Sequence, residues 1–109
     1  MITWNDFEKI EMRVGTVIEV QDFPEARKPA YKLKIDFGEY GIKQSSAQIT
    51  KLYSKEDLLN RQVIAVINFP PKQIANVFSE CLVLGAVSKD GEVVLLEVDR
   101  PVTNGERIG

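Results

Sequence analysis

The chain has 109 residues, enough for one domain with one hydrophobic core. Its formal net charge of -2 argues against broad, sequence-independent binding to nucleic acid, which depends on an excess of Lys and Arg. The absence of histidine excludes a His-based catalytic triad and a His-ligated metal site, and the single cysteine, Cys81, excludes an internal disulfide. We therefore predict a complete, cytoplasmic binding protein with no catalytic residues, no metal and no cofactor.

The first residues predict a short helix over residues 5–9. Thr3 is a suitable N-cap, and Asp6 follows it three positions later. Trp4 and Phe7 bring more apolar area than so short a helix can bury. We expect these two side chains to dock on the body of this subunit or on a partner.

Three strands are expected next, over residues 13–20, 31–38 and 42–47. Gly15 lies inside the first strand, where glycine often marks a bulge or a tight bend of a barrel. The second strand alternates between apolar residues that should face the core and polar residues that should face outward. These are Leu33, Ile35 and Phe37 on one face, and Lys32, Lys34 and Asp36 on the other.

The second half of the chain begins with the strongest helix start, a Ser54 cap followed by acidic residues, and this helix should end near Asn60. Further strands are expected over residues 62–68, 80–87 and 93–98. The apolar run from residue 63 to 67 does not alternate, so both faces of that strand should be covered, by another element or by another subunit.

Three strands, a short helix and two more strands follow the order of the OB-fold, an all-β, five-stranded Greek-key barrel. An SH3-like barrel would lack the intervening helix. We expect one domain over residues 1–109, with extensions at 1–11 and 99–109 that form a homodimer with two-fold symmetry. The expected interface residues are apolar: Trp4, Phe7, Val94, Leu96 and Ile108.

Two segments are candidates for ligand binding. The first is a basic segment, which is either a solvated barrel face or a patch that follows a phosphate or peptide backbone. It consists of Arg27, Lys28, Lys32, Lys34 and Lys43. The second is residues 68–72, which is either a stiff turn whose Phe69 caps the barrel or an exposed aromatic and proline rim beside Lys72. Small polar groups near the barrel mouth add weaker candidates: Gln44, Ser45, Ser46 and Ser79.

Several motifs resemble the tRNA-binding-domain family, an OB-fold found in methionyl-tRNA synthetase tails, in the phenylalanyl-tRNA synthetase beta chain and in free-standing dimers. They span nearly the whole chain: Asp6-Phe7, Arg13-Val14-Gly15, Phe23-Pro24, Ile35-Asp36-Phe37-Gly38, Asn68-Phe69 with Pro71-Lys72, and Ser79-Glu80. Residues 41–51 and 66–71 are similar to the CsaA branch of that family. That branch comprises homodimeric, export-related chaperones associated with unfolded preproteins and the SecA translocase.

The resemblance implies a chaperone that binds unfolded secretory preprotein segments, with structure-selective tRNA binding as the alternative. Phe69 stands where the tRNA-binding relatives carry leucine, and the segment after Pro71 has one basic residue fewer, which favours a peptide ligand. The expected ligand-binding residues are Lys32, Lys34, Lys43, Gln44, Ser45, Ser46, Asn68, Phe69, Pro71, Lys72 and Ser79.

Overall fold

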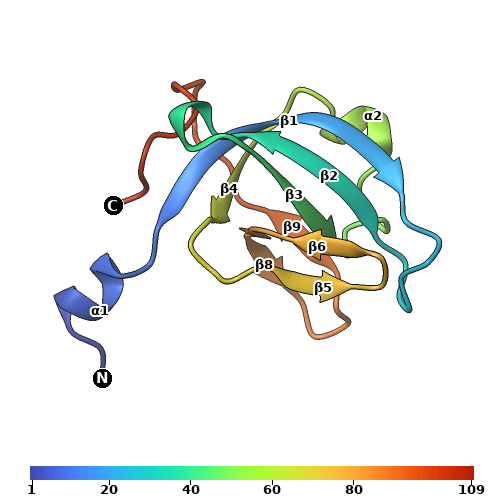
Figure 1. The fold of residues 1–109 in the computed structure, drawn as a ribbon, viewed down its shortest axis with the longest axis horizontal. Coiled ribbons are helices and arrows are strands. Elements are labelled where there is room, and N and C mark those ends of the chain that lie inside the picture. The colour runs from blue at the N-terminus through green and yellow to red at the C-terminus, as the bar shows by residue number, and fades with distance from the viewer.

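The computed structural model describes residues 1–109 and contains a nearly closed, five-stranded antiparallel barrel (Figure 1). The strand order is β3-β2-β1-β4-β7, so the first strand lies at the centre of the sheet. The strands of this sheet are β1 (Met12–Asp22), β2 (Tyr31–Asp36), β3 (Ile42–Ala47), β4 (Gln62–Val66) and β7 (Leu82–Val83). The predicted OB-type barrel is confirmed.

The central strand β1 is long and bent because it pairs with different neighbours along its length. Its first half pairs with β4 and its second half with β2, and the register with β2 shifts between Val17 and Glu19. This bulge lies two residues beyond Gly15, where the sequence had suggested one. Gly15 instead allows a close approach, since an added Cβ would lie 2.6 Å from Ile35 Cγ2 and 2.7 Å from Phe37 Cδ1.

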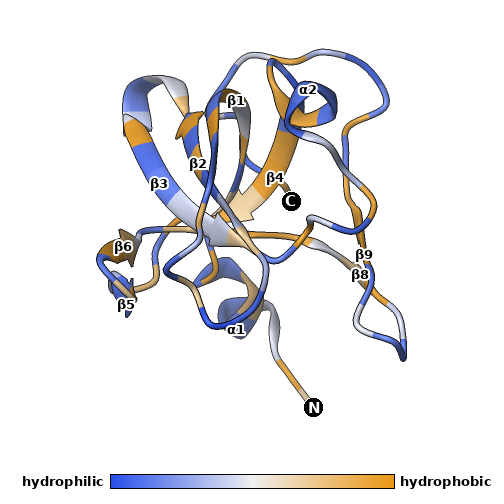
Figure 2. Cartoon of the chain, turned by 90° about the vertical axis from the view of Figure 1, so that its right-hand side faces the viewer, coloured by the Kyte–Doolittle hydropathy of each residue, from blue (hydrophilic) through white to orange (hydrophobic).

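The alternation of β2 and the continuous apolar run of β4 produce the core. Leu33, Ile35 and Phe37 are buried as predicted. In β4, all four residues from Val63 to Val66 are buried, and Figure 2 shows that strand as hydrophobic along its length. The prediction that both faces of β4 are covered is therefore confirmed, and the cover comes from within this chain.

Both predicted helices are present, and both begin at the expected caps. α1 (Trp4–Glu8) and α2 (Lys55–Leu58) each begin with a capping box, in which the side chains of Thr3 and Ser54 accept from the N–H groups of Asp6 and Asp57. A single 3-10 turn, η1 (Gly38–Tyr40), links β2 to β3. α1 stands away from the barrel in Figure 1. No helix of the protein is long and apolar enough to cross a membrane.

The segment after β4 differs from the prediction of one long strand over residues 80–87. It forms two hairpins, β5 (Lys72–Ile74) with β6 (Val77–Ser79), and β8 (Gly85–Val87) with β9 (Val93–Leu95). The first hairpin turns at Ala75, which has a φ of 52°. Sequence analysis had assigned no strand to 72–79, because neither short run alternates clearly between apolar and polar residues.

The C-terminal tail extends the sheet beside the first half of β1, where β2 does not reach. Val14 donates its N–H to Glu106 O and accepts from Gly105 N, and Ile108 N donates to Met12 O. The Arg13 guanidinium donates to Gly105 O at 3.1 Å and stacks over the Tyr40 ring at 4.2 Å. Residues 105–108 therefore bond to β1 of their own chain.

Candidate ligand-binding groove

An open groove of about 580 Å³ lies between the two hairpins, over the end of β3. Its lining is mainly apolar, with polar groups at its edges. The lining comes from three regions, the end of β3, the first hairpin with its preceding turn, and the β7 to β9 segment. These residues are Ser46, Ala47, Gln48, Ile49, Phe69, Pro70, Lys72, Ile74, Ser79, Cys81, Leu82, Val83, Val87 and Val93.

Four of the predicted ligand residues line this groove: Ser46, Phe69, Lys72 and Ser79. Phe69 is 54% exposed, so it belongs to the rim and does not cap the barrel core. Lys72 forms no ion pair within the chain, and its backbone pairs with Ser79 across the β5–β6 hairpin. The hairpin therefore presents a cation and a hydroxyl side by side at one end of the groove.

Ser45 does not face a ligand, and this corrects the expectation that it would. Its side chain is 2% exposed, and its hydroxyl donates to Cys81 O at 3.1 Å. The Ser79 hydroxyl donates to the same carbonyl at 3.2 Å. Ser45 thus fixes the chain at Cys81, beneath the groove. Burial raises the pKa of the Cys81 thiol to about 11, so this lining residue stays an uncharged thiol at neutral pH.

Asn68 is also bound within the chain, and it does not line the groove. Its side-chain amide donates to Lys9 O at 2.7 Å, and its side-chain oxygen accepts from Glu11 N at 3.0 Å. The amide thus satisfies the backbone of the segment between α1 and β1. Asn68 positions the start of the turn that carries Phe69.

The predicted basic face is divided by the strand register. Lys32 pairs with Ser46 and Lys34 with Gln44, whereas Lys43 pairs with Ile35 on the opposite face of the sheet. Lys34 forms an ion pair with Glu19 at 3.7 Å, and Lys32 lies over the Phe23 ring at 5.4 Å. The three lysines therefore do not form one patch, and none of them lines the groove.

The remaining two predicted residues border the groove without lining it. The Gln44 backbone bonds to Glu80 through both its N–H and its carbonyl, which attaches β3 to the segment after β6. Pro71 is exposed beside Pro70, and only the latter lines the groove. Both residues act on the site by fixing the backbone around it.

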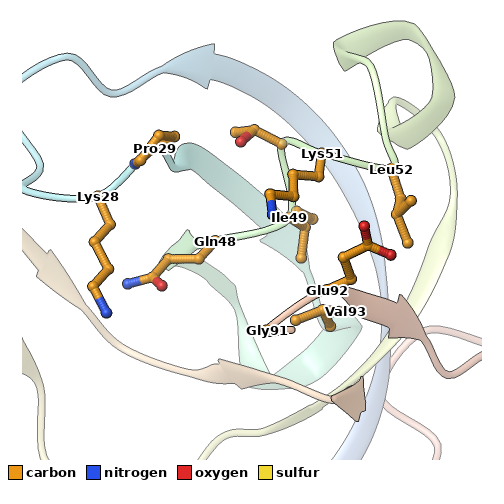
Figure 3. Close-up of a pocket in the computed structure, with 10 residues that line it drawn as sticks. Lys28, Pro29, Gln48, Ile49, Lys51, Leu52, Gly91, Glu92 and Val93 are labelled. Atoms are coloured by element: carbon orange, nitrogen blue, oxygen red, sulfur yellow. The ribbon is translucent and has the colours of Figure 1, made fainter. Parts of the chain in front are cut away.

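A smaller, more polar pocket of about 180 Å³ adjoins the groove and shares Gln48, Ile49 and Val93 with it. Figure 3 shows Lys28 and Glu92 on opposite sides of this pocket, with Gln48 and Ile49 between them. Lys51 also lines it. Neither Lys28 nor Lys51 forms an ion pair, so unpaired lysines line both the groove and the pocket beside it.

Sequence reasoning missed most of the apolar lining. Leu82 and Val87 are exposed and line the groove, although the sequence assigned both to one continuous strand over residues 80–87. A signal was available in Gly85, because glycine inside a strand often marks a bend or a close backbone approach. Lys28 belongs to the basic segment that the sequence indicated, whereas Lys51 lies in a loop whose approach to the pocket depends on its three-dimensional path.

Comparison with known proteins places this geometry in context. The family model described as "Putative tRNA binding domain" matches residues 12–107. Methionine–tRNA ligases of Thermococcus onnurineus and Methanocaldococcus jannaschii are 42% and 37% identical over 98% and 93% of this chain. The chain spans only about 14–15% of the length of these ligases.

Solved structures match over the whole chain. The chaperone CsaA of Bacillus anthracis has a TM-score of 0.95 at 52% identity, and the match covers 100% of this chain and 99% of that one. The CsaA chaperone protein of Picrophilus torridus has a TM-score of 0.93 at 60% identity, with 100% of each chain covered. A MetRS-related protein of Pyrococcus horikoshii has a TM-score of 0.89 at 28% identity, covering 100% and 98% of the two chains.

Proposed function

The chain belongs to the tRNA-binding-domain family and resembles its CsaA chaperones over its full length, and from this premise we propose that it is a peptide-holding chaperone. Its clients are unfolded segments of secretory preproteins, held in the groove between the two hairpins until export. One observation carries the proposal: the groove lining is mainly apolar and its one lysine, Lys72, forms no ion pair. Apolar contact is non-directional, which suits a ligand of varied sequence.

The roles of the groove residues follow from their positions. Phe69 and Leu82 offer half-exposed apolar side chains that a client side chain can cover. Lys72 in the groove, with Lys28 and Lys51 in the adjoining pocket, attracts acidic side chains or backbone carbonyls. Because the groove lining is mainly apolar, affinity should depend more on buried apolar area than on ionic strength.

Structure-selective tRNA binding is the second candidate, and a specific observation favours it. The family model and the methionine–tRNA ligase relatives both concern tRNA, and the unpaired lysines could meet phosphates. In that case Phe69 would stack on a base, which aromatic side chains do without sequence preference. The two candidates use the same groove and differ in which contacts provide the affinity.

Salt dependence separates the two ligands. Labelled tRNA and a labelled, chemically unfolded polypeptide are titrated with the protein at low and at moderate salt. Phosphate contacts release counterions, so tRNA affinity should fall steeply as salt rises, whereas affinity for the polypeptide should change little. Tight, salt-sensitive tRNA binding with no measurable polypeptide binding would reverse the order of the two candidates.

The proposed assembly is a homodimer that also meets the SecA translocase. Trp4 is 84% exposed on the projecting helix α1, where a second subunit could cover it. Val94 on β9 and Leu96 just after it are exposed, whereas Leu95 between them packs against the core. Ile108 is partly buried in the tail. Co-sedimentation of the protein with SecA, with and without an unfolded preprotein, tests the second partner.

A further inference from the structure

The edge of β3 beside the groove carries unpaired backbone groups. Phe37 donates its N–H to Gly41 O, so these two opposed residues form a hydrogen-bonded pair. Because hydrogen-bonded and non-hydrogen-bonded pairs alternate in an antiparallel ladder, the odd-numbered residues of β3 bond to β2. The N–H and C=O groups of Gln44, Ser46 and Gln48 must therefore point away from β2. This is the free edge of the five-stranded sheet.

The chain itself satisfies only the first part of this edge. Glu80 N donates to Gln44 O, as in a parallel β ladder, and Gln44 N donates to the Glu80 side chain. At Ser46 the N–H donates to the Ser79 hydroxyl at 3.4 Å, in place of a backbone carbonyl. Beyond this point no backbone or side chain of the protein bonds to Ser46 O or to Gln48 N. The barrel is thus left open where the groove begins.

These two groups have the spacing of a strand-pairing site. In parallel pairing, a single residue on the neighbouring strand bonds to two residues of the edge strand. Its N–H donates to the carbonyl of one residue, and its C=O accepts from the N–H of the residue two positions later. Ser46 O and Gln48 N are such a pair, on either side of Ala47. Ser46, Ala47 and Gln48 all line the groove, so an incoming chain can reach them.

We propose that a client peptide binds as an added strand, parallel to β3, along the Ser46–Gln48 edge. This mode rests on the proposed chaperone function and specifies how the groove recognises its ligand. Backbone hydrogen bonds are independent of sequence, while alternate side chains of an extended peptide enter the apolar lining around Phe69, Leu82 and Val87. The donor and acceptor together match a peptide unit, whereas a phosphate would leave Ser46 O without a donor.

Backbone methylation of the ligand tests this mode directly. The probe is a fluorescein-labelled, apolar ten-residue peptide selected for binding to the parent protein, together with a series in which each residue in turn is N-methylated. Methylation of the residue opposite Ala47 should weaken binding about five- to tenfold, because it removes one hydrogen bond and obstructs the edge. Methylation of the residues on either side of it should be tolerated, because their N–H groups point away from β3.

Two measurements on the protein complete the test. Hydrogen exchange of the Gln48 amide should slow in the peptide complex. Gln48→Pro removes this N–H and should weaken binding, whereas the control Gln48→Ala keeps the N–H and should lose less affinity than Gln48→Pro. The exchange and methylation results decide the matter if Gln48→Pro fails to fold.

The outcomes distinguish this inference from the function on which it rests. A peptide that binds, tolerates methylation at every position and leaves Gln48 exchange unchanged overturns strand addition and leaves the chaperone proposal standing. No binding of any unfolded polypeptide overturns both. Protection of the Gln48 amide by tRNA but not by peptide also overturns strand addition of a peptide.

Discussion

Replacement of Phe69 by alanine should weaken the binding of unfolded polypeptide without altering the fold. Phe69 is 54% exposed, and a fully covered aromatic side chain buries roughly 150–250 Å². A ligand can therefore cover roughly 100 Å² of this side chain. At about 25 cal/mol per Å² this area is worth about 2.5 kcal/mol when the ligand covers all of it. The dissociation constant of Phe69→Ala should rise by up to about 60-fold.

The chain provides a matched control for this substitution. Phe78 is 56% exposed and lies on the neighbouring strand β6, yet it does not line the groove. Phe78→Ala removes the same side chain from the same hairpin region and should bind as the parent does. Fluorescence anisotropy with a labelled unfolded polypeptide measures both affinities, and chemical denaturation shows whether each variant retains its stability.

Three results would refute this reasoning. Equal losses of affinity in Phe69→Ala and Phe78→Ala would mean that general surface hydrophobicity, and not the groove, holds the ligand. Unchanged affinity in both variants would place the site elsewhere on the protein. A large loss of folding stability in Phe69→Ala alone would show that this side chain supports the fold, contrary to its exposure.

Three further predictions concern the fold and the assembly. Gly15→Ala should lower the free energy of unfolding by about 1–3 kcal/mol, because the new methyl group would overlap buried side chains. The control Gly109→Ala adds a methyl group with no neighbouring atom, so chemical denaturation should show an unchanged free energy of unfolding. Burial raises the pKa of the Cys81 thiol from 9.0 to about 11 in the folded protein, so the thiol ionises first in the unfolded chain. The parent should therefore lose folding stability relative to Cys81→Ala between about pH 9 and 11. Parallel profiles of folding stability against pH for the two proteins would contradict this. At micromolar concentration, light scattering should give a mass of twice 12.3 kDa for the parent and for the groove variant Val87→Asp. The interface variant Val94→Asp should give 12.3 kDa. A monomeric parent would exclude the proposed dimer.

The sequence predicted the barrel well because local signals and the global fold agree. The alternation of Leu33, Ile35 and Phe37, the apolar run of β4 and the caps Thr3 and Ser54 each specify one element. These elements alone give the order of an OB-type barrel. The N-terminal and C-terminal extensions could be expected as additions, but their pairing with β1 and with Asn68 depends on long-range contacts.

The site was predicted less well, because position along a strand does not reveal which groups are already bound. Ser45 and Asn68 are small polar residues near the barrel mouth, and both make their hydrogen bonds within the chain. Lys43 falls on the opposite face from Lys32 because the β2–β3 register pairs residues of equal parity. Phe69 and Lys72 were identified correctly as groove residues because a stiff proline turn can only lie at a surface.

The tail that pairs with β1 also affects how the protein folds during synthesis. Arg13 and Gly105 are separated by 92 residues, and the hydrogen bonds beside them close a loop of similar length. Residues 105–108 must leave the ribosome before this loop can close, so β1 keeps an open edge until then. Long loops close at a greater entropic cost, which slows the contacts that depend on them. Until the tail pairs, a nascent chain of this protein exposes the kind of strand edge that chaperones recognise.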